Sequence, residues 1–208
     1  MKTSSLISLI CSLTINGFNT FHQPAAAAPL PKSWHVAEAL SPAEAANEDD
    51  KLVAVQVNGK YGYQDAAGRM KIAPRFDNVY EFFDGLAAVS IAGKWGFITR
   101  CGKAVIPLHF DNAVSFNNGL AAVQIEDKWG FIDKQGTMVI EPDFDAAESF
   151  SQGLAKVKVG DKWGFIDKQG EIAIKPIYDE VDSFHNDMAW IRIDKKVGYI
   201  DQTGKFLQ

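Results

Sequence analysis

Cysteine and clustered positive charge are both scarce in this chain of 208 residues. It has two cysteines, and its formal net charge is −5, from 21 Lys and Arg against 26 Asp and Glu. Small exported domains that depend on disulfides are rich in cysteine, so a disulfide framework is excluded and packing must stabilise the fold. Nucleic-acid binding needs clustered basic residues, and no basic run here exceeds a few positions, so we expect no nucleic-acid partner.

Apolar residues, in contrast, are plentiful. They make up 47% of the chain, and aromatic residues alone make up 12%. Disordered chains have too little apolar surface to bury, so this composition predicts a folded protein. The length is enough for one domain with a substantial core.

The first residues have the features of an export signal. Lys2 precedes an apolar run over residues 6–15, and the small residues of 24–31 allow cleavage after Ala27 or Ala28. We therefore expect a signal peptide over residues 1–28 and a periplasmic or secreted protein. Residues 29–50 are rich in alanine, proline and acid, and are expected to be a linker, with room for a short helix.

The apolar run is too short for a membrane-spanning helix, which needs about 20 apolar residues. The alternative is an uncleaved signal, through which alone the chain would contact a membrane. Lipid attachment at Cys11 is not expected, because the bulky Ile10 precedes it and it lies inside the apolar run. Cleavage would remove Cys11 and leave Cys101 as a single cysteine without an internal disulfide.

One short motif recurs at a fixed step. KWGFID occurs at 128–133 and again at 162–167, and KWGFIT occurs at 94–99. The glycine of this motif recurs every 34 residues, at Gly62, Gly96, Gly130, Gly164 and Gly198. A motif repeated at one spacing is typical of a structural unit rather than of a catalytic site. The sequence therefore divides into five tandem copies, at 51–84, 85–118, 119–152, 153–186 and 187–208, the last of them truncated.

The local pattern within a copy predicts three short antiparallel strands. A step of 34 residues also fits helix pairs, but two-residue pairs such as Asn58–Gly59 are strong hairpin turns, and a glycine inside KWGFID disfavours a helix. A second turn over residues 133–136 begins with Asp and ends with Gly, and the next segment ends at a proline. We expect an all-β protein whose five units stack as an open β-solenoid or superhelical array. The alternative is closure into a five-bladed propeller.

Alternation along KWGFID places apolar side chains on both faces of the strand, so stacking copies should cover both faces. The glycine of the motif is expected to leave a slot for a large ring from a neighbouring strand or copy. We predict that the repeated WG pairs anchor the seams between copies from the interior, and that replacing one indole by alanine costs about 3–5 kcal/mol. These anchors are Trp95, Trp129, Trp163, Gly96, Gly130 and Gly164.

Copies one and five lack the tryptophan and have Tyr61 and Val197 in its place. A terminal copy has one neighbour, so it gains less from a large ring and needs a more polar outer side. The substitutions therefore predict that the outer copies end the array with polar faces.

The consensus GLAAVxIxxKWGFIDxxGxxVIxPxFDxxxxF resembles the WG repeat family of bacterial proteins, also called KWG repeats. The resemblance covers about three quarters of the chain, from Lys51 onward, and is most specific in copies two to four. Copy two departs from it, since its proline lies one place early, at Pro107. The resemblance implies an all-β repeat protein, often exported or associated with the envelope. It implies no catalytic site and supplies no functional residue to carry over.

Two acidic columns, meaning residues related by the 34-residue step, could suggest metal or acid–base chemistry. We interpret both as structural, because aspartate side chains bond nearby backbone amides in turns and Thr99 replaces one of them. No zinc spacing or calcium loop is present, and His109, His185 and Cys101 occupy unrelated positions. We therefore expect no metal, no cofactor and no enzymatic activity. The first acidic column is Asp77, Asp111, Asp145 and Asp179, and the second is Asp65, Asp133, Asp167 and Asp201.

Function by binding is expected where the copies differ. One variable column gives a short basic run at Arg100, Lys134 and Lys168, which are candidate partner-contacting residues. A second variable column contains Phe83, Asn117, Ser151 and His185, and a third contains Arg75, His109, Asp143 and Ile177.

We expect an exported interaction or scaffold module with a protein partner in the cell envelope or outside the cell. The alternatives are a carbohydrate-binding protein that stacks its repeated aromatic rings on sugars and, third, a hydrolase.

Overall fold

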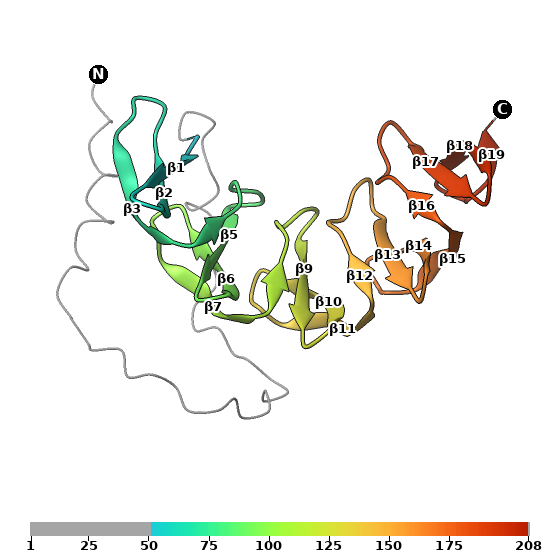
Figure 1. Ribbon diagram of the computed structural model, residues 1–208, viewed down its shortest axis with the longest axis horizontal. Helices are drawn as coiled ribbons and strands as arrows, with labels where there is room; N and C mark the ends of the chain where they lie inside the picture. Colours follow the sequence, from blue (N-terminus) through green and yellow to red (C-terminus); the bar gives the residue numbers. More distant parts are fainter. Residues whose placement is uncertain (1–50, 208) are drawn as a thin grey trace, which may run out of the picture. The chain divides into compact units, whose positions relative to one another are not determined.

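The computed structural model describes residues 51–207, where all regular elements are β-strands (Figure 1). The predicted signal peptide and linker lie outside this range. Within it, no helix is long and apolar enough to cross a membrane. The strands form five antiparallel sheets, each with its strands in chain order. The first sheet contains β1 (Val53–Val57), β2 (Lys60–Gln64) and β3 (Met70–Phe76).

The other four sheets each have four strands. In each of them the first strand is only two residues long, and in the last sheet the fourth strand is equally short. They are β4 (Asn78–Val79), β5 (Leu86–Ile91), β6 (Lys94–Thr99) and β7 (Ala104–Phe110); β8 (Asn112–Ala113), β9 (Leu120–Ile125), β10 (Lys128–Asp133) and β11 (Met138–Phe144); β12 (Ala146–Ala147), β13 (Ala155–Val159), β14 (Lys162–Ile166) and β15 (Ile172–Tyr178); β16 (Glu180–Val181), β17 (Met188–Ile193), β18 (Lys196–Asp201) and β19 (Phe206–Leu207).

Both hairpin turns of a copy follow from the sequence. Asn58 and Gly59 have φ of 51° and 79°, the left-handed pair that a two-residue hairpin requires. In the second turn, the carboxylate of Asp133 accepts hydrogen bonds from the backbone N–H groups of Gln135 and Thr137, at 2.9 and 2.8 Å. The second acidic column therefore closes turns, as the sequence predicts.

The expectation of three strands per copy is met by the long strands, and the linking segment adds a fourth. At the end of copy one, Asn78 and Val79 pair with Ser90 and Val89 of copy two, at the edge of the next sheet. The link between copies is thus a short strand of the sheet that follows it. We call residues 77–85, 111–119, 145–153 and 179–187 the linking segments.

The hydrophobic cores lie between successive sheets and cover both faces of the middle sheets, as predicted. Phe97 and Leu86, on one face of the second sheet, pack in a buried cluster with Val123 of the third sheet. Val89 and Ile98, on the other face, belong to the cluster shared with the first sheet. Four such clusters exist among residues 51–207, and none joins the first sheet to the fifth. The predicted open array of five stacked units is confirmed.

The glycine of the motif recurs in every copy for a reason other than the predicted slot for a large ring. A Cβ at Gly130 would lie 2.5 Å from the carbonyl oxygen of Ile140 and 2.8 Å from the nitrogen of Pro142. Both atoms belong to β11, which crosses β10 with a bulge at this point. The space beside the glycine is therefore filled by backbone of the same sheet. Only at Gly198 does a ring, that of Phe206, lie nearest, at 3.2 Å.

The tryptophans of the motif pack on the cores from their edges. Trp95, Trp129 and Trp163 are half-buried and lie against three different clusters. The interior position belongs to the aromatic residue two places later, because Phe131 has no exposed surface and its ring lies 5.0 Å from that of Phe150. Tyr63, Phe97 and Phe165 have the same place in their copies and the same kind of ring partner. The role of interior anchor therefore moves from the indole to this residue.

A polar clasp holds each seam. The carboxylate of Asp145 accepts a hydrogen bond from Lys128 of the preceding sheet at 2.6 Å and one from the backbone N–H of Gly160 in the next hairpin turn, also at 2.6 Å. The lysine bond is the main reason why the pKa of Asp145 lies below its usual value. The same clasp recurs at Asp77, Asp111 and Asp179. The first acidic column is therefore structural, as interpreted from the sequence.

The prediction of polar outer faces is wrong for the last copy. Val197 is 62% exposed and Tyr199 is 51% exposed on the outer face of the fifth sheet. The tryptophan of the motif is lost there, but smaller apolar and aromatic residues remain in its place.

Candidate binding groove

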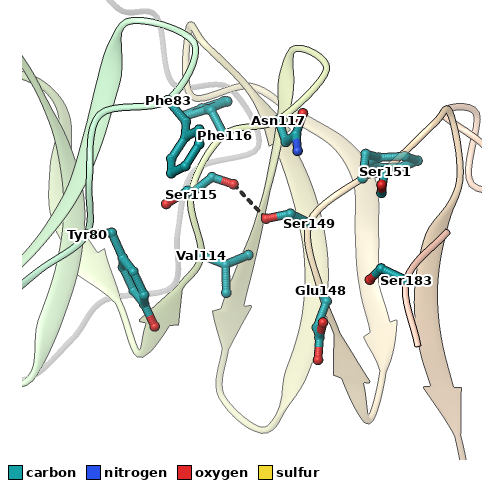
Figure 2. Close-up of a pocket in the computed structure, with 11 residues that line it drawn as sticks. Tyr80, Phe83, Val114, Ser115, Phe116, Asn117, Glu148, Ser149, Ser151 and Ser183 are labelled. Atoms are coloured by element: carbon teal, nitrogen blue, oxygen red, sulfur yellow. Dashed lines mark hydrogen bonds between the residues drawn. The ribbon is translucent and has the colours of Figure 1, made fainter. Parts of the chain in front are cut away.

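A groove of about 500 Å³ runs along the linking segments of the middle copies (Figure 2). Its lining combines two exposed aromatic rings with four serines, one amide and one carboxylate, over a floor of buried phenylalanines. The lining residues are Tyr80, Phe83, Val114, Ser115, Phe116, Asn117, Glu148, Ser149, Phe150, Ser151 and Ser183.

Stacking of the copies produces the groove. Each linking segment begins with a two-residue strand and ends at a tight turn, such as the one where Phe83 and Leu86 exchange backbone hydrogen bonds at 3.0 Å. Because the sheets stack in register, residues 34 positions apart lie next to one another along the groove. Ser149 Oγ donates to the carbonyl oxygen of Ser115 at 2.9 Å, which is the dashed line in Figure 2.

The floor of the groove is rigid. Phe116 and Phe150 have no exposed surface and form edge-on pairs with Phe97 and Phe131 in the cores below. A second serine, Ser151, donates through Oγ to the carbonyl oxygen of Phe184 at 2.6 Å. The groove is thus formed before any ligand binds, which reduces the entropy lost on binding.

Two aromatic rings stand at one end of the groove. Both belong to the linking segment of residues 77–85, and Tyr80 is 42% exposed and Phe83 is 49% exposed. Figure 2 shows the Tyr80 ring to the left of Val114. The Tyr80 ring lies 5.4 Å from the indole of Trp95, so the half-buried tryptophan supports an exposed ring of the groove.

The polar groups of the groove suit binding. Glu148 is the one carboxylate of the lining, and Lys156 Nζ lies 2.9 Å from its Oε1. Acid–base or nucleophilic catalysis needs a second, partnered group within reach, and the remaining polar lining groups are hydroxyls and an amide. Within residues 51–207, no three His, Cys, Asp or Glu side chains lie close enough together to hold a metal ion.

The basic column does not line the groove. The Arg100 guanidinium lies 5.7 Å from the centre of the Phe82 ring, and Lys168 Nζ donates to the carbonyl oxygen of Asn118 at 2.8 Å. Lys134 is half-buried. Arg100 and Lys168 contact linking segments of their own chain, so these two stabilise the array.

The second variable column contributes three of its four members to the groove. Phe83, Asn117 and Ser151 line it, while His185 is exposed beyond its end. Sequence reasoning missed the residues beside them, because the linking segment was interpreted as a simple connector. Tyr80, Val114 and Glu148 form one column that varies among the copies, and this variation could have indicated a binding surface in the linking segments.

The other candidates lie apart from the groove. Arg75 donates to the carbonyl oxygen of Gly102 at 2.8 Å. The ring of His109 lies 3.9 Å from that of Phe110, and burial lowers the pKa of the histidine. Cys101 lies at an exposed turn.

Comparison with known proteins identifies the family. The family described as "WG containing repeat" matches residues 61–95, 95–129, 129–163 and 163–196. The chain therefore belongs to the WG-repeat family, as the resemblance implied. No curated protein sequence matches the chain.

Solved structures of low sequence identity are similar to this chain in fold only. A structure described as KlHsv2 with loop 6CD replaced by a Gly-Ser linker is 10% identical, with a TM-score of 0.53 over 77% of this chain and 62% of that one. A eukaryotic initiation factor is 14% identical, with a TM-score of 0.48 over 76% and 52%. A protein of unknown function from Bacteroides caccae is 14% identical, with a TM-score of 0.36 over 76% of each chain. This chain thus spans less than two thirds of the first two.

Proposed function

We propose that this chain is an exported, non-catalytic interaction module that holds a segment of a partner protein in the groove of its linking segments. The partner belongs to the cell envelope or lies outside the cell, because the first 28 residues have the features of an export signal.

The observation that carries this proposal is the pair of exposed rings, Tyr80 and Phe83, at a preformed groove of about 500 Å³. Protein interfaces draw most of their affinity from a few aromatic anchors that lie in or beside well-packed pockets. The hydroxyl and amide groups of Ser115, Asn117 and Ser149 supply hydrogen bonds that orient a bound chain. The copies keep their seam residues and vary two columns of the groove, Tyr80, Val114 and Glu148, and Phe83, Asn117 and Ser151, which is the pattern of a scaffold that presents a specific surface.

A photo-crosslinking residue at Phe83 tests this function in intact cells that make the protein. We expect a discrete crosslinked protein partner, which disappears when Tyr80 is replaced by alanine. Ile177, 48% exposed in β15 and absent from the groove, is the matched control position. Equal crosslinking from Ile177, or crosslinking unaffected by Tyr80→Ala, contradicts the proposal. Fractionation of the same cells, with and without residues 1–28, tests export.

Carbohydrate binding is the second candidate, and the same exposed rings favour it. Aromatic faces stack on sugars, and the serines and Asn117 could bond sugar hydroxyls. A glycan array separates the two functions, because binding that is lost in Tyr80→Ala and Phe83→Ala would assign the groove to a sugar.

A further inference from the structure

The last sheet has an apolar outer face, which we call the tail face. Trp190 and Tyr199 are paired across β17 and β18, and Tyr199 is paired with Leu207 of β19. Met188 and Val197 lie on the same face, two residues along their strands. Four of these five residues are between 39% and 62% exposed, and Trp190 is half-buried.

The same face is a seam in every earlier sheet. Tyr199 is the fifth member of the column of Tyr63, Phe97, Phe131 and Phe165, all of which have no exposed surface. Met188 similarly follows leucines, of which Leu86 is fully buried. The tail face therefore has the residue types of a buried seam. No sheet within residues 51–207 packs against it.

The missing half exists at the other end of the array. We call it the head face, formed by Val53, Val55 and Val57 with Gln64, which is paired with Val53. Val53 and Val55 occupy the columns of Ala87 and Val89, which pack on the sheet before them and have no exposed surface. In the first sheet Val53 and Val55 are half-buried, and Val57 is 42% exposed.

We propose that a second copy of this chain covers the tail face with its own head face, so that the array continues from one molecule to the next. The four seams of the chain pair the same two strand faces. Each seam also has a linking-segment phenylalanine, such as Phe116 against Phe97, which the described residues of the head face lack. A head-to-tail contact pairs the tail face of one molecule with the head face of another. Each pair still has one unpaired head face and one unpaired tail face, so further molecules can add to form open chains. A fully polar face at the ends would prevent this, whereas the tail face carries five apolar or aromatic residues beside Arg192 and Asp201.

Two single variants test the proposal, because each blocks one end only. Tyr199→Lys places a charge in the middle of the tail face, and Val55→Lys does the same on the head face. The full chain is measured by sedimentation velocity over a hundredfold range of concentration. We expect the mean mass of the wild type to rise with concentration, and each variant alone to stay monomeric.

The mixture of the two variants is the decisive sample. Val55→Lys has a free tail face and Tyr199→Lys has a free head face, so an equal mixture should form a dimer and nothing larger. Val139→Lys, at an apolar residue that is 44% exposed in the third sheet, is the matched control and should assemble like the wild type. Tyr80→Ala should also assemble, which separates this proposal from the function of the groove.

The other outcomes overturn the proposal. A wild type that is monomeric at every concentration means that residues outside the described range, or nothing, cover these faces. Self-association of Val55→Lys alone means that two tail faces meet each other. A mixture that stays monomeric, with both variants folded by circular dichroism, excludes the head-to-tail contact. Val57→Lys replaces Val55→Lys if the latter fails to fold.

Discussion

Replacing Phe131 by alanine should destabilise the array more than replacing Trp129, although tryptophan is the larger residue. Phe131 has no exposed surface and packs against Phe150 at a ring distance of 5.0 Å. Removing a buried phenylalanine leaves a cavity and costs about 3–5 kcal/mol. Trp129 is half-buried, so its loss removes less surface from the core and should cost about 1–3 kcal/mol.

The assay is thermal and urea unfolding followed by far-ultraviolet circular dichroism. For a domain of this size, 1 kcal/mol lowers Tm by about 2–4 °C, so Phe131→Ala should lower it by about 6–20 °C. Repeat arrays can unfold in parts, so hydrogen exchange of β9 and β13 should show whether the loss is confined to the neighbouring seams. Val139→Ala, at an exposed position, should change stability by less than about 0.5 kcal/mol. A Trp129→Ala variant as unstable as Phe131→Ala would refute the assignment of the interior anchor.

Two further predictions concern the backbone and the clasp. Gly130→Ala should lower Tm markedly, since its methyl group would meet the Ile140 carbonyl oxygen at 2.5 Å, whereas Gly198→Ala meets only a ring edge and should be tolerated; equal losses would contradict this. The pKa of Asp145 is lowered in the folded chain, mainly by the hydrogen bond from Lys128, so its stabilising effect is present above the pKa of the unfolded state, about 4, and is lost as pH falls through the folded value. Urea midpoints between pH 7 and pH 3 should therefore fall less steeply in Asp145→Asn than in the wild type, and identical slopes would exclude the clasp.

The long strands and their turns could be predicted from sequence because their causes are local. Asn58–Gly59 and Asp133 fix their turns through residues two to four positions away. Because the same residues recur every 34 positions, each copy forms the same turns and the same long strands. The open array also followed, because a three-stranded unit with apolar residues on both faces must bury each face against a neighbour.

The reason for the glycine of the motif could not be predicted, because it depends on the register of a bulge. Gly130 faces Ile140 and Pro142 only because β11 slips against β10 between Trp129 and Ile132. No local pattern gives that slip. The short strands were missed for the same reason, since Ala146 and Ala147 pair with β13 only after the next copy has docked.

Stacking also explains why the groove was only partly visible in the sequence. Phe83 and Asn117 stood out as variable members of one column, but Tyr80 and Ser149 acquire their common surface only when three linking segments lie side by side. The residues that fix this surface are elsewhere, in the buried ring pairs and the lysine–aspartate clasps. Under the proposed function, a substitution at Tyr80 or Phe83 is therefore expected to change what the groove binds without removing the buried ring pairs or the clasps. Under the proposed binding function, such a separation would let one repeat serve different ligands and would place the specificity of this chain in its linking segments.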